Sequence, residues 1–145
     1  MESFFTGVRR TCLKENEILR SLLIPANNPG TSLHSGFIKV GTRRSMECAV
    51  VSLGYHIQTG SDGTVTAAGV AIGSVAPTIR LAKSAGRFLV GKRYESIDAK
   101  EAETFAGLVM EYACPISDLR ASAQYRNQVL FNISKSLFDQ PQTKV

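Results

Sequence analysis

Apolar and polar residues alternate through the first half of the chain, and this pattern predicts strands of an antiparallel sheet. Residues 49–58 alternate best: from Val51 onward one side is apolar or aromatic and the other is polar or glycine. Ser61-Asp62-Gly63 then signals a tight turn, so residues 64–74 are expected to return as the antiparallel neighbour. Residues 37–43 fit a further strand.

The pattern before residue 37 is less regular. Residues 18–24 are mostly apolar and stop at Pro25, which cannot continue a ladder, so they are predicted to form a strand that ends there. Residues 26–36 contain two Asn, a Pro-Gly pair and two Ser, which predicts a loop. Residues 2–17 lack a clean period and are expected to be loop with at most one short helical turn.

Helical signals fill the second half of the chain. Pro77 suits the first turn of a helix that closes at Gly91. Asp98, followed three residues later by Glu101, resembles the capping box of a second helix.

A third helix is expected near residue 120, where Ser117, Asp118 and Ser122 are all competent N-caps. Its expected apolar face consists of Val129, Leu130, Ile133 and Leu137. Strands followed by helices predict an α+β fold, with an antiparallel sheet of three to four strands followed by three helices packed on one face.

The predicted strand 64–74 is rich in small residues, Gly69 and Gly73 among them. Small residues in a strand indicate that something packs close to the backbone, either a helix or a ligand. The glycine spacing matches no phosphate-binding loop. Both explanations stay open, and packing of the helix that begins at Pro77 is the simpler one.

Composition narrows the class of protein. The chain has 145 residues, of which 43% are hydrophobic, enough for one domain with its own core. No apolar run approaches the roughly 20 residues of a membrane span, and the first residues lack a signal-peptide core, so a cytoplasmic protein is expected. The net charge of +5 is spread over the chain without an aromatic-interleaved basic stripe, so nucleic-acid binding is not expected.

No catalytic or metal site is predicted. The three cysteines and two histidines stand apart from one another and from carboxylates at metal-ligand spacing. Asp118, Arg120, Tyr125 and Arg126 cluster around a helix start, where caps and local ion pairs are the expected role.

Four segments carry a family resemblance: SFFTGVRRT with the later E-I-L and I-P, FIKVGTRR followed by CAVVSLG, GVAIGSVAPT, and PISDLRASAQYR. Together they run from about Ser3 to Phe138. They resemble the C-terminal domain of the FAD-binding subunit of xanthine dehydrogenase and carbon monoxide dehydrogenase-type molybdenum hydroxylases. The last segment is the most specific; it resembles D-x-R-G-S-A-x-Y-R, with Ala121 where Gly is usual.

The resemblance implies a role in FAD binding. In that family two N-terminal lobes hold most of the FAD, and electrons reach it from [2Fe–2S] clusters. This chain would form one wall of the FAD pocket and a partner-subunit interface, with Lys39 and Leu19 matching positions that touch the flavin. The implied partners are a flavin-domain half, a [2Fe–2S] subunit and a molybdopterin subunit. Because the glycine-rich nucleotide-binding half is absent from the sequence, the isolated chain is expected to be inactive and not to retain FAD.

The expected organisation is a linker at 1–17, the domain at 18–139 and a flexible tail at 140–145. An apolar patch involving Leu19, Ile38 and the small-residue strand is expected to be exposed where the flavin lobes dock, and to favour self-association. The alternative function, from a different class, is a stand-alone α+β interaction or dimerisation module without redox activity.

Overall fold

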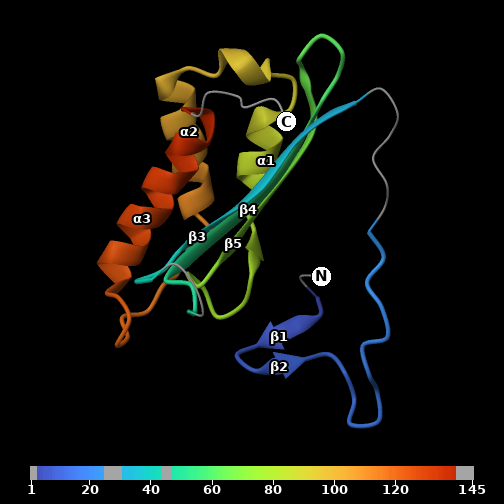
Figure 1. The fold of residues 1–145 in the computed structure, drawn as a ribbon, viewed down its shortest axis with the longest axis vertical. Coiled ribbons are helices and arrows are strands. Elements are labelled where there is room, and N and C mark those ends of the chain that lie inside the picture. The colour runs from blue at the N-terminus through green and yellow to red at the C-terminus, as the bar shows by residue number, and fades with distance from the viewer. Residues whose placement is uncertain (1–2, 25–30, 44–46, 140–145) are drawn as a thin grey trace.

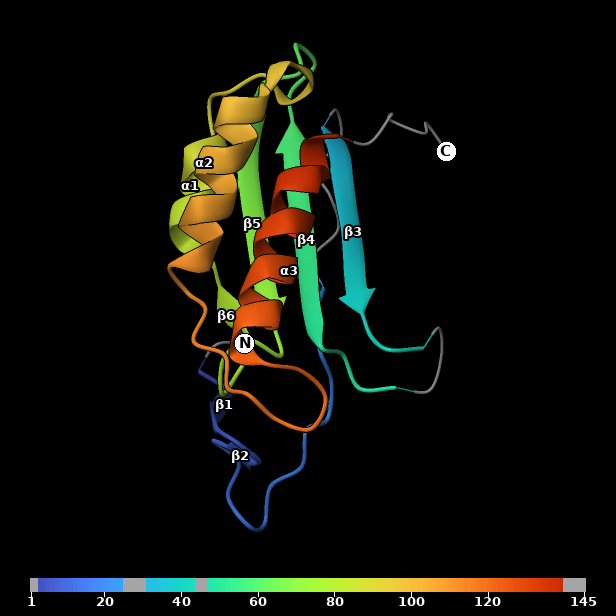
Figure 2. The same ribbon diagram turned by 90° about the vertical axis from the view of Figure 1, so that its left-hand side faces the viewer.

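The computed structural model describes residues 3–24, 31–43 and 47–139. The described chain forms a four-stranded antiparallel sheet with three α-helices on one of its faces, and a separate two-stranded ribbon near the N-terminus (Figures 1 and 2). The predicted α+β class, with strands first and helices on one face, is therefore confirmed.

The sheet has the order β3-β4-β5-β6, and each strand pairs with the next one along the chain. Its members are β3 (Ser32–Val40), β4 (Val51–Thr59), β5 (Val65–Gly73) and the short β6 (Arg80–Leu81). The β4–β5 turn is the predicted one: the side chain of Asp62 accepts a hydrogen bond from the Thr64 backbone N–H at 3.0 Å, and Gly63 takes a positive φ of 78°.

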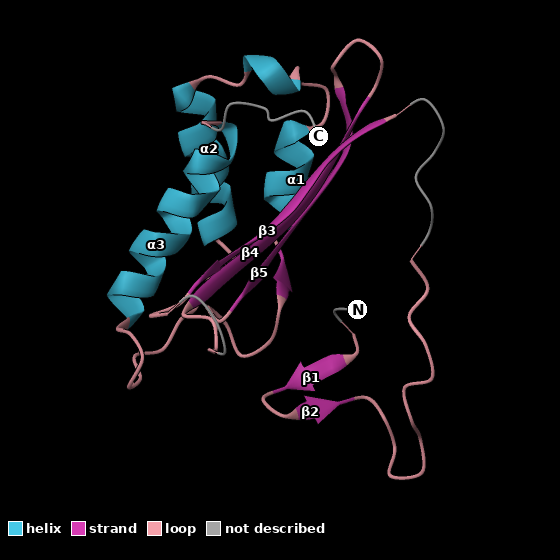
Figure 3. Ribbon diagram, in the orientation of Figure 1, coloured by secondary structure: helices cyan, strands magenta, loops and turns pink. Residues whose placement is uncertain are grey.

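The helices are α1 (Lys83–Leu89), α2 (Ala99–Met110) and α3 (Ala123–Lys135), with 3₁₀ turns at Tyr94–Ser96 and Ser136–Phe138. Figure 3 shows how these elements alternate with loops along the second half of the chain. Asp98 caps α2 through the predicted capping box with Glu101, and Ser122 is the N-cap of α3. Local sequence signals therefore set both helix starts.

The core lies between the sheet and the helices. Alternate residues of β4 face the helices, as the pattern predicted; Val51, Leu53 and Ile57 are fully buried and Tyr55 is partly buried. They meet the apolar faces of α2 and α3, and the largest of these buried side chains are Leu53, Ile57, Phe105 and Leu130. Burial of this alternating face fixes the strand register, because a slip of one residue would expose every core side chain.

Helix α1 lies directly on β5. A Cβ atom at Gly86 would come within 2.6 Å of the backbone oxygen of Ala68, so only glycine permits this approach. Close helix packing therefore accounts for Ala68 on the inner face, whereas Ala67, Gly69, Ala71 and Gly73 lie on the outer face. The predicted start of this helix at Pro77 is wrong, because Arg80 and Leu81 pair with β5 and the helix begins only at Lys83.

Three further predictions need correction. Residues 18–24 form no strand in the structure; they are extended and exposed, because no described segment pairs with them. Residues 2–17 are not simply loop, since β1 (Phe5–Gly7) and β2 (Arg10–Thr11) form a hairpin with Arg9 at φ 56°. Finally, the predicted loop 26–36 overlaps β3, which begins at Ser32 and pairs with β4 over its whole length; residues 26–30 lie outside the described part.

Candidate functional site

The face of the sheet that points away from the helices carries no described helix (Figure 2). Strand alternation assigns twelve residues to this outer face, and most of them are small. They are Leu33, Ser35, Phe37 and Lys39 from β3; Ser52, Gly54, His56 and Gln58 from β4; and Ala67, Gly69, Ala71 and Gly73 from β5.

Two cross-strand rows on the outer face, here called the shelf, lie next to each other. In the first, Lys39 lies opposite Ser52, which lies opposite Gly73; in the second, Phe37 lies opposite Gly54 and then Ala71. A Cβ at Gly73 would come within 2.5 Å of the Ser52 Oγ, so a larger residue there would disturb the row. Phe37 is 70% exposed. An aromatic ring and a cation thus border a floor that holds no bulky side chain.

The ammonium of Lys39 is held by the loop that follows β3. Its Nζ donates to the backbone oxygen of Glu47 at 3.2 Å. The Glu47 carboxylate in turn accepts hydrogen bonds from the Thr42 hydroxyl and from the Arg43 backbone N–H, and these bonds lower the pKa of Glu47. A Cβ at Gly41 would lie 2.8 Å from the Glu47 carboxylate. One hydrogen bond thus ties the exposed Lys39 to Glu47, whose own side chain is fixed by Thr42 and Arg43.

Leu19, the other predicted flavin contact, lies in the extended segment 18–24 and is about half exposed. Figure 1 shows this segment at the far side of the domain from the C-terminal end of β3. The described chain therefore does not bring Leu19 and Lys39 together. Ile38 was predicted to lie in the exposed patch, and this prediction is wrong. Because it alternates with Lys39, Ile38 faces the helices and packs against the core.

A cleft of about 550 Å³ adjoins the shelf, between the β1–β2 hairpin and the segment that follows β5. Arg9 and Arg10 line one wall, and Ser74 and Thr78 line the other. Apolar residues supply much of the remaining lining; they are Phe5, Ala76, Pro77 and Ile79. The sequence reading missed this cleft, because the hairpin that forms one wall was predicted as loop.

The segment Pro115–Arg126 has a structural role, which the side chain of Arg126 provides through hydrogen bonds. The Arg126 side chain is 4% exposed, and its Nη1 donates to the backbone oxygens of Val50 at 2.6 Å and Ser74 at 2.9 Å. Its Nη2 donates to Asp118 Oδ1 at 2.8 Å. The backbone N–H groups of Arg120 and Ala121, and then Arg126, hold the pKa of Asp118 below its ordinary value. The predicted role as caps and ion pairs is therefore confirmed for Asp118 and Arg126.

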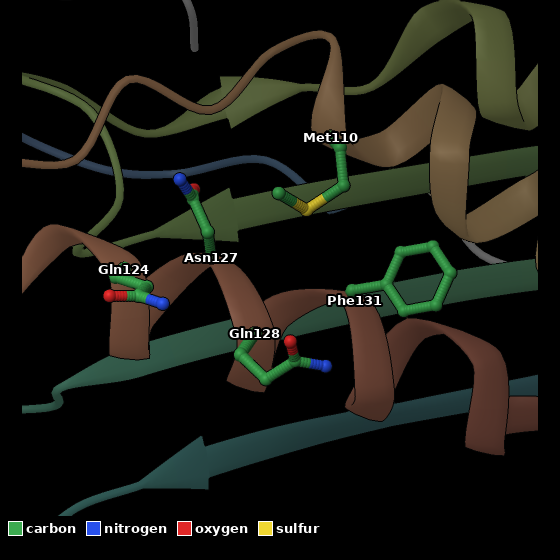
Figure 4. Close-up of a pocket in the computed structure, with 5 residues that line it drawn as sticks. All are labelled: Met110, Gln124, Asn127, Gln128 and Phe131. Carbon is green, nitrogen blue, oxygen red and sulfur yellow. The ribbon is translucent and has the colours of Figure 1, made fainter.

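A second hollow, of about 590 Å³, lies between the end of α2 and the outer side of α3 (Figure 4). Three amide side chains, one thioether and one phenyl ring line it, and none of them titrates. They are Met110, Gln124, Asn127, Gln128 and Phe131. This lining offers no acid, base or nucleophile for catalysis.

No group of three or more His, Cys, Asp or Glu side chains within the described ranges is placed to hold a metal ion. His34 lies on the inner face of β3 and stacks on Tyr94 with a ring-centroid distance of 4.3 Å, whereas His56 is exposed on β4. Both are strand histidines, as predicted. None of the described helices is long and apolar enough to span a bilayer.

Comparison with known proteins matches residues 37–140 to the family model of the CO dehydrogenase flavoprotein C-terminal domain. The carbon monoxide dehydrogenase medium chain of Hydrogenophaga pseudoflava is 32% identical over 128 residues, which cover 86% of this chain and 41% of that protein. The xanthine dehydrogenase of Emericella nidulans is 33% identical over 95 residues, 65% of this chain and 7% of that protein.

Solved structures give the same assignment. The carbon monoxide dehydrogenase of Hydrogenophaga pseudoflava superposes with a TM-score of 0.80 at 28% identity, over 92% of this chain and 44% of that one. Quinoline 2-oxidoreductase from Pseudomonas putida 86 superposes with a TM-score of 0.77 at 30% identity, over 94% of this chain and 45% of that one. This chain spans less than half the length of each of these relatives. It belongs to the family of CO dehydrogenase flavoprotein C-terminal domains, the C-terminal domain of the FAD-binding subunit of molybdenum hydroxylases.

Proposed function

We propose that this domain forms one wall of the FAD pocket of a molybdenum hydroxylase, and that it contributes a partner-subunit interface in electron transfer from [2Fe–2S] clusters to FAD. The observation that carries the proposal is the position of Lys39: it stands at the border of a shelf of small residues that no described helix covers. The family assignment supplies the class of cofactor.

The residues of the shelf fit a flavin. An isoalloxazine ring is planar, and the small residues Ser52, Ala71 and Gly73 would let a planar group approach the backbone closely. Phe37 offers an aromatic edge beside it. When bound, FAD accepts electrons and passes them to an acceptor. The positive charge of Lys39 would favour the reduced, anionic form of the ring. Leu19 would supply an apolar contact in an assembly that brings segment 18–24 to the ring.

The proposal includes partners beyond this chain. The relatives are more than twice as long as the part matched here, and the carbon monoxide dehydrogenase relative is named a medium chain. We infer that a flavin-binding half, a [2Fe–2S] subunit and a molybdopterin subunit complete the assembly. The outer sheet face, which no described helix covers, supports this, because it exposes the large apolar side chain of Phe37.

The test is a potentiometric titration of FAD in the reconstituted assembly, with wild-type chain and with Lys39→Met. Loss of a cation near the ring should lower the flavin reduction potential by an amount on the order of tens of millivolts. Lys100→Met, on the exposed side of α2, removes the same charge from the helical layer and should leave the potential unchanged.

An unchanged potential in Lys39→Met, with both variants folded and assembled, would contradict the flavin role of Lys39. It would favour the alternative in which the domain is an interaction or dimerisation module without redox activity.

A further inference from the structure

The side chain of Glu47 joins the two ends of the loop between β3 and β4. Its Oε1 accepts a hydrogen bond from the Thr42 hydroxyl, and its Oε2 accepts one from the Arg43 backbone N–H at 2.6 Å. Thr42 and Arg43 lie just after β3, whereas Glu47 lies shortly before β4. One carboxylate therefore connects the start of the loop to its end.

This carboxylate fits closely against the backbone of the loop. A Cβ atom at Gly41 would lie 2.8 Å from Glu47 Oε2, so a larger residue there would push the carboxylate away. The hydrogen bonds from the Thr42 side chain and the Arg43 N–H lower the pKa of Glu47, so the group is a charged acceptor at neutral pH. Because Glu47 belongs to neither strand, its own side chain fixes where its main chain lies.

The main chain of the same residue binds Lys39. The carbonyl oxygen of Glu47 accepts a hydrogen bond from Lys39 Nζ at 3.2 Å. Among the residues that the structure describes, Lys39 forms no ion pair with a carboxylate. A carbonyl group has no net charge, so it fixes the direction of the ammonium without cancelling the positive charge. A carboxylate partner would have offset that charge at the shelf.

The effect of this charge depends on where the ammonium is held. Lys39 is an exposed residue with a flexible stem, and such a side chain samples many rotamers unless a contact restrains it. Coulomb energy falls with the reciprocal of distance, so a charge that doubles its distance from a ring loses about half of its effect. The contact with Glu47 therefore determines how strongly Lys39 acts on a group bound at the shelf.

We propose that Glu47 is a positioning residue for Lys39: its side chain fixes the loop, so that its carbonyl oxygen holds the ammonium at the border of the shelf and the charge raises the flavin reduction potential. The inference rests on the proposed function for the identity of the bound group. It assigns to the loop between β3 and β4 a part in tuning the flavin, although its residues need not touch the ring.

A double-mutant cycle in the reconstituted assembly separates positioning from the charge of Glu47 itself. Glu47→Ala removes a negative charge, and this direct effect on the flavin potential is the same with Lys39 and with Lys39→Met. An effect that acts through Lys39 is present only when Lys39 is there. Relative to its effect in the Lys39→Met background, Glu47→Ala should therefore lower the potential of the otherwise wild-type assembly.

The expected size of this difference is about half, or more, of the decrease that Lys39→Met causes by itself. Equal effects of Glu47→Ala in the two backgrounds would overturn the proposal. Glu47→Gln keeps the length of the side chain and one acceptor oxygen, so it should give a smaller difference than Glu47→Ala. A difference as large as that of Glu47→Ala would contradict a role for the fit of this side chain in the loop.

A charge-neutral change tests the same contact. Thr42→Val removes the hydroxyl that donates to Glu47 Oε1 and should lower the flavin potential. Thr104→Val is the matched control, because the Thr104 hydroxyl donates to the backbone oxygen of Lys100 on the exposed side of α2. Its loss should leave the potential unchanged. Equal potentials in the two valine variants would contradict the role of the Glu47 carboxylate.

The isolated chain gives a readout that needs no flavin. Nuclear magnetic resonance relaxation of the Lys39 Cε–Nζ group, assigned by its loss in Lys39→Met, should show restricted motion in the wild type. In Glu47→Ala this group should become as mobile as that of Lys100, which is exposed on α2. Equal mobility of Lys39 in the wild type and in Glu47→Ala would overturn positioning by Glu47.

The two proposals can fail separately. If Lys39→Met leaves the potential unchanged while Glu47→Ala frees the Lys39 side chain, the flavin role of Lys39 fails and the contact with Glu47 stands. If Lys39→Met lowers the potential while Glu47→Ala leaves Lys39 as ordered as before, the proposed function stands and positioning by Glu47 fails.

Discussion

Arg126 Nη2 lies 2.8 Å from Asp118 Oδ1, and this contact joins the start of α3 to the loop that leads into it. The same guanidinium reaches the ends of two strands through the carbonyl oxygens of Val50 and Ser74. One buried side chain thus fastens the third helix to the central sheet. The most specific sequence motif, residues 115–126, is therefore explained by the attachment of α3 to the sheet rather than by chemistry on a substrate.

Replacing Arg126 by lysine should lower the free energy of unfolding by about 2–3 kcal/mol. A single ammonium cannot reproduce the fork that serves two carbonyls and a carboxylate, so buried acceptors lose their donors. Urea denaturation measures the difference. Arg120→Met is the control: its guanidinium is exposed and 3.8 Å from Asp118, and its loss should change stability by no more than about 0.5 kcal/mol. Equal losses of unfolding free energy in the two variants would contradict this structural role of Arg126.

Asp118 should make stability depend on pH in the acid range. Its folded-state pKa is depressed, so its contribution is complete above the unfolded pKa of about 3.9 and is lost as the pH falls through the lower folded value. Stability of the wild type should therefore decline from about pH 5 to pH 2 more steeply than that of Asp118→Asn. Denaturation curves at a series of pH values compare the two proteins, and parallel pH profiles would rule out this role.

Gly86→Ala and Gly107→Ala should change the free energy of unfolding in opposite directions. A methyl group at residue 86 would meet the Ala68 oxygen at 2.6 Å and push α1 off the sheet, which should destabilise the protein by about 1–3 kcal/mol. Residue 107 is exposed on α2 with nothing within 4 Å, so alanine there should stabilise by about 0.5–1 kcal/mol. Thermal unfolding measures the stability of both variants. If Gly86→Ala did not lower stability, the close approach of α1 to β5 would not require glycine at residue 86.

The isolated chain should purify without colour and should not bind FAD stoichiometrically. Dinucleotides are held mainly by glycine-rich loops whose N–H groups contact the pyrophosphate, and the sequence contains no such loop. Absorbance spectra and a fluorescence titration with FAD test this. A yellow preparation with one FAD per chain would contradict this prediction and place the main FAD affinity in this domain.

Elements with a complete local signal were predicted from the sequence. The alternation of β4, the Asp62–Gly63 turn and the capping box of Asp98 each depend on residues within a few positions of one another. The two sides of β3 were also assigned correctly, which placed Lys39 on the outer face. For these elements, propensity and pattern contain most of the physical information.

Tertiary structure decided the features whose partners are distant in sequence. Residues 80–81 join the sheet because β5 offers them a free edge, although Pro77 suits a helix start. Residues 18–24 have a strand-like composition but form no strand, because a strand needs a neighbour and no described segment pairs with them. Arg126 is buried because the carbonyls of Val50 and Ser74, more than fifty residues away, converge on it. The sequence determined which segments could pair or pack; only the folded chain decided which of them found a partner.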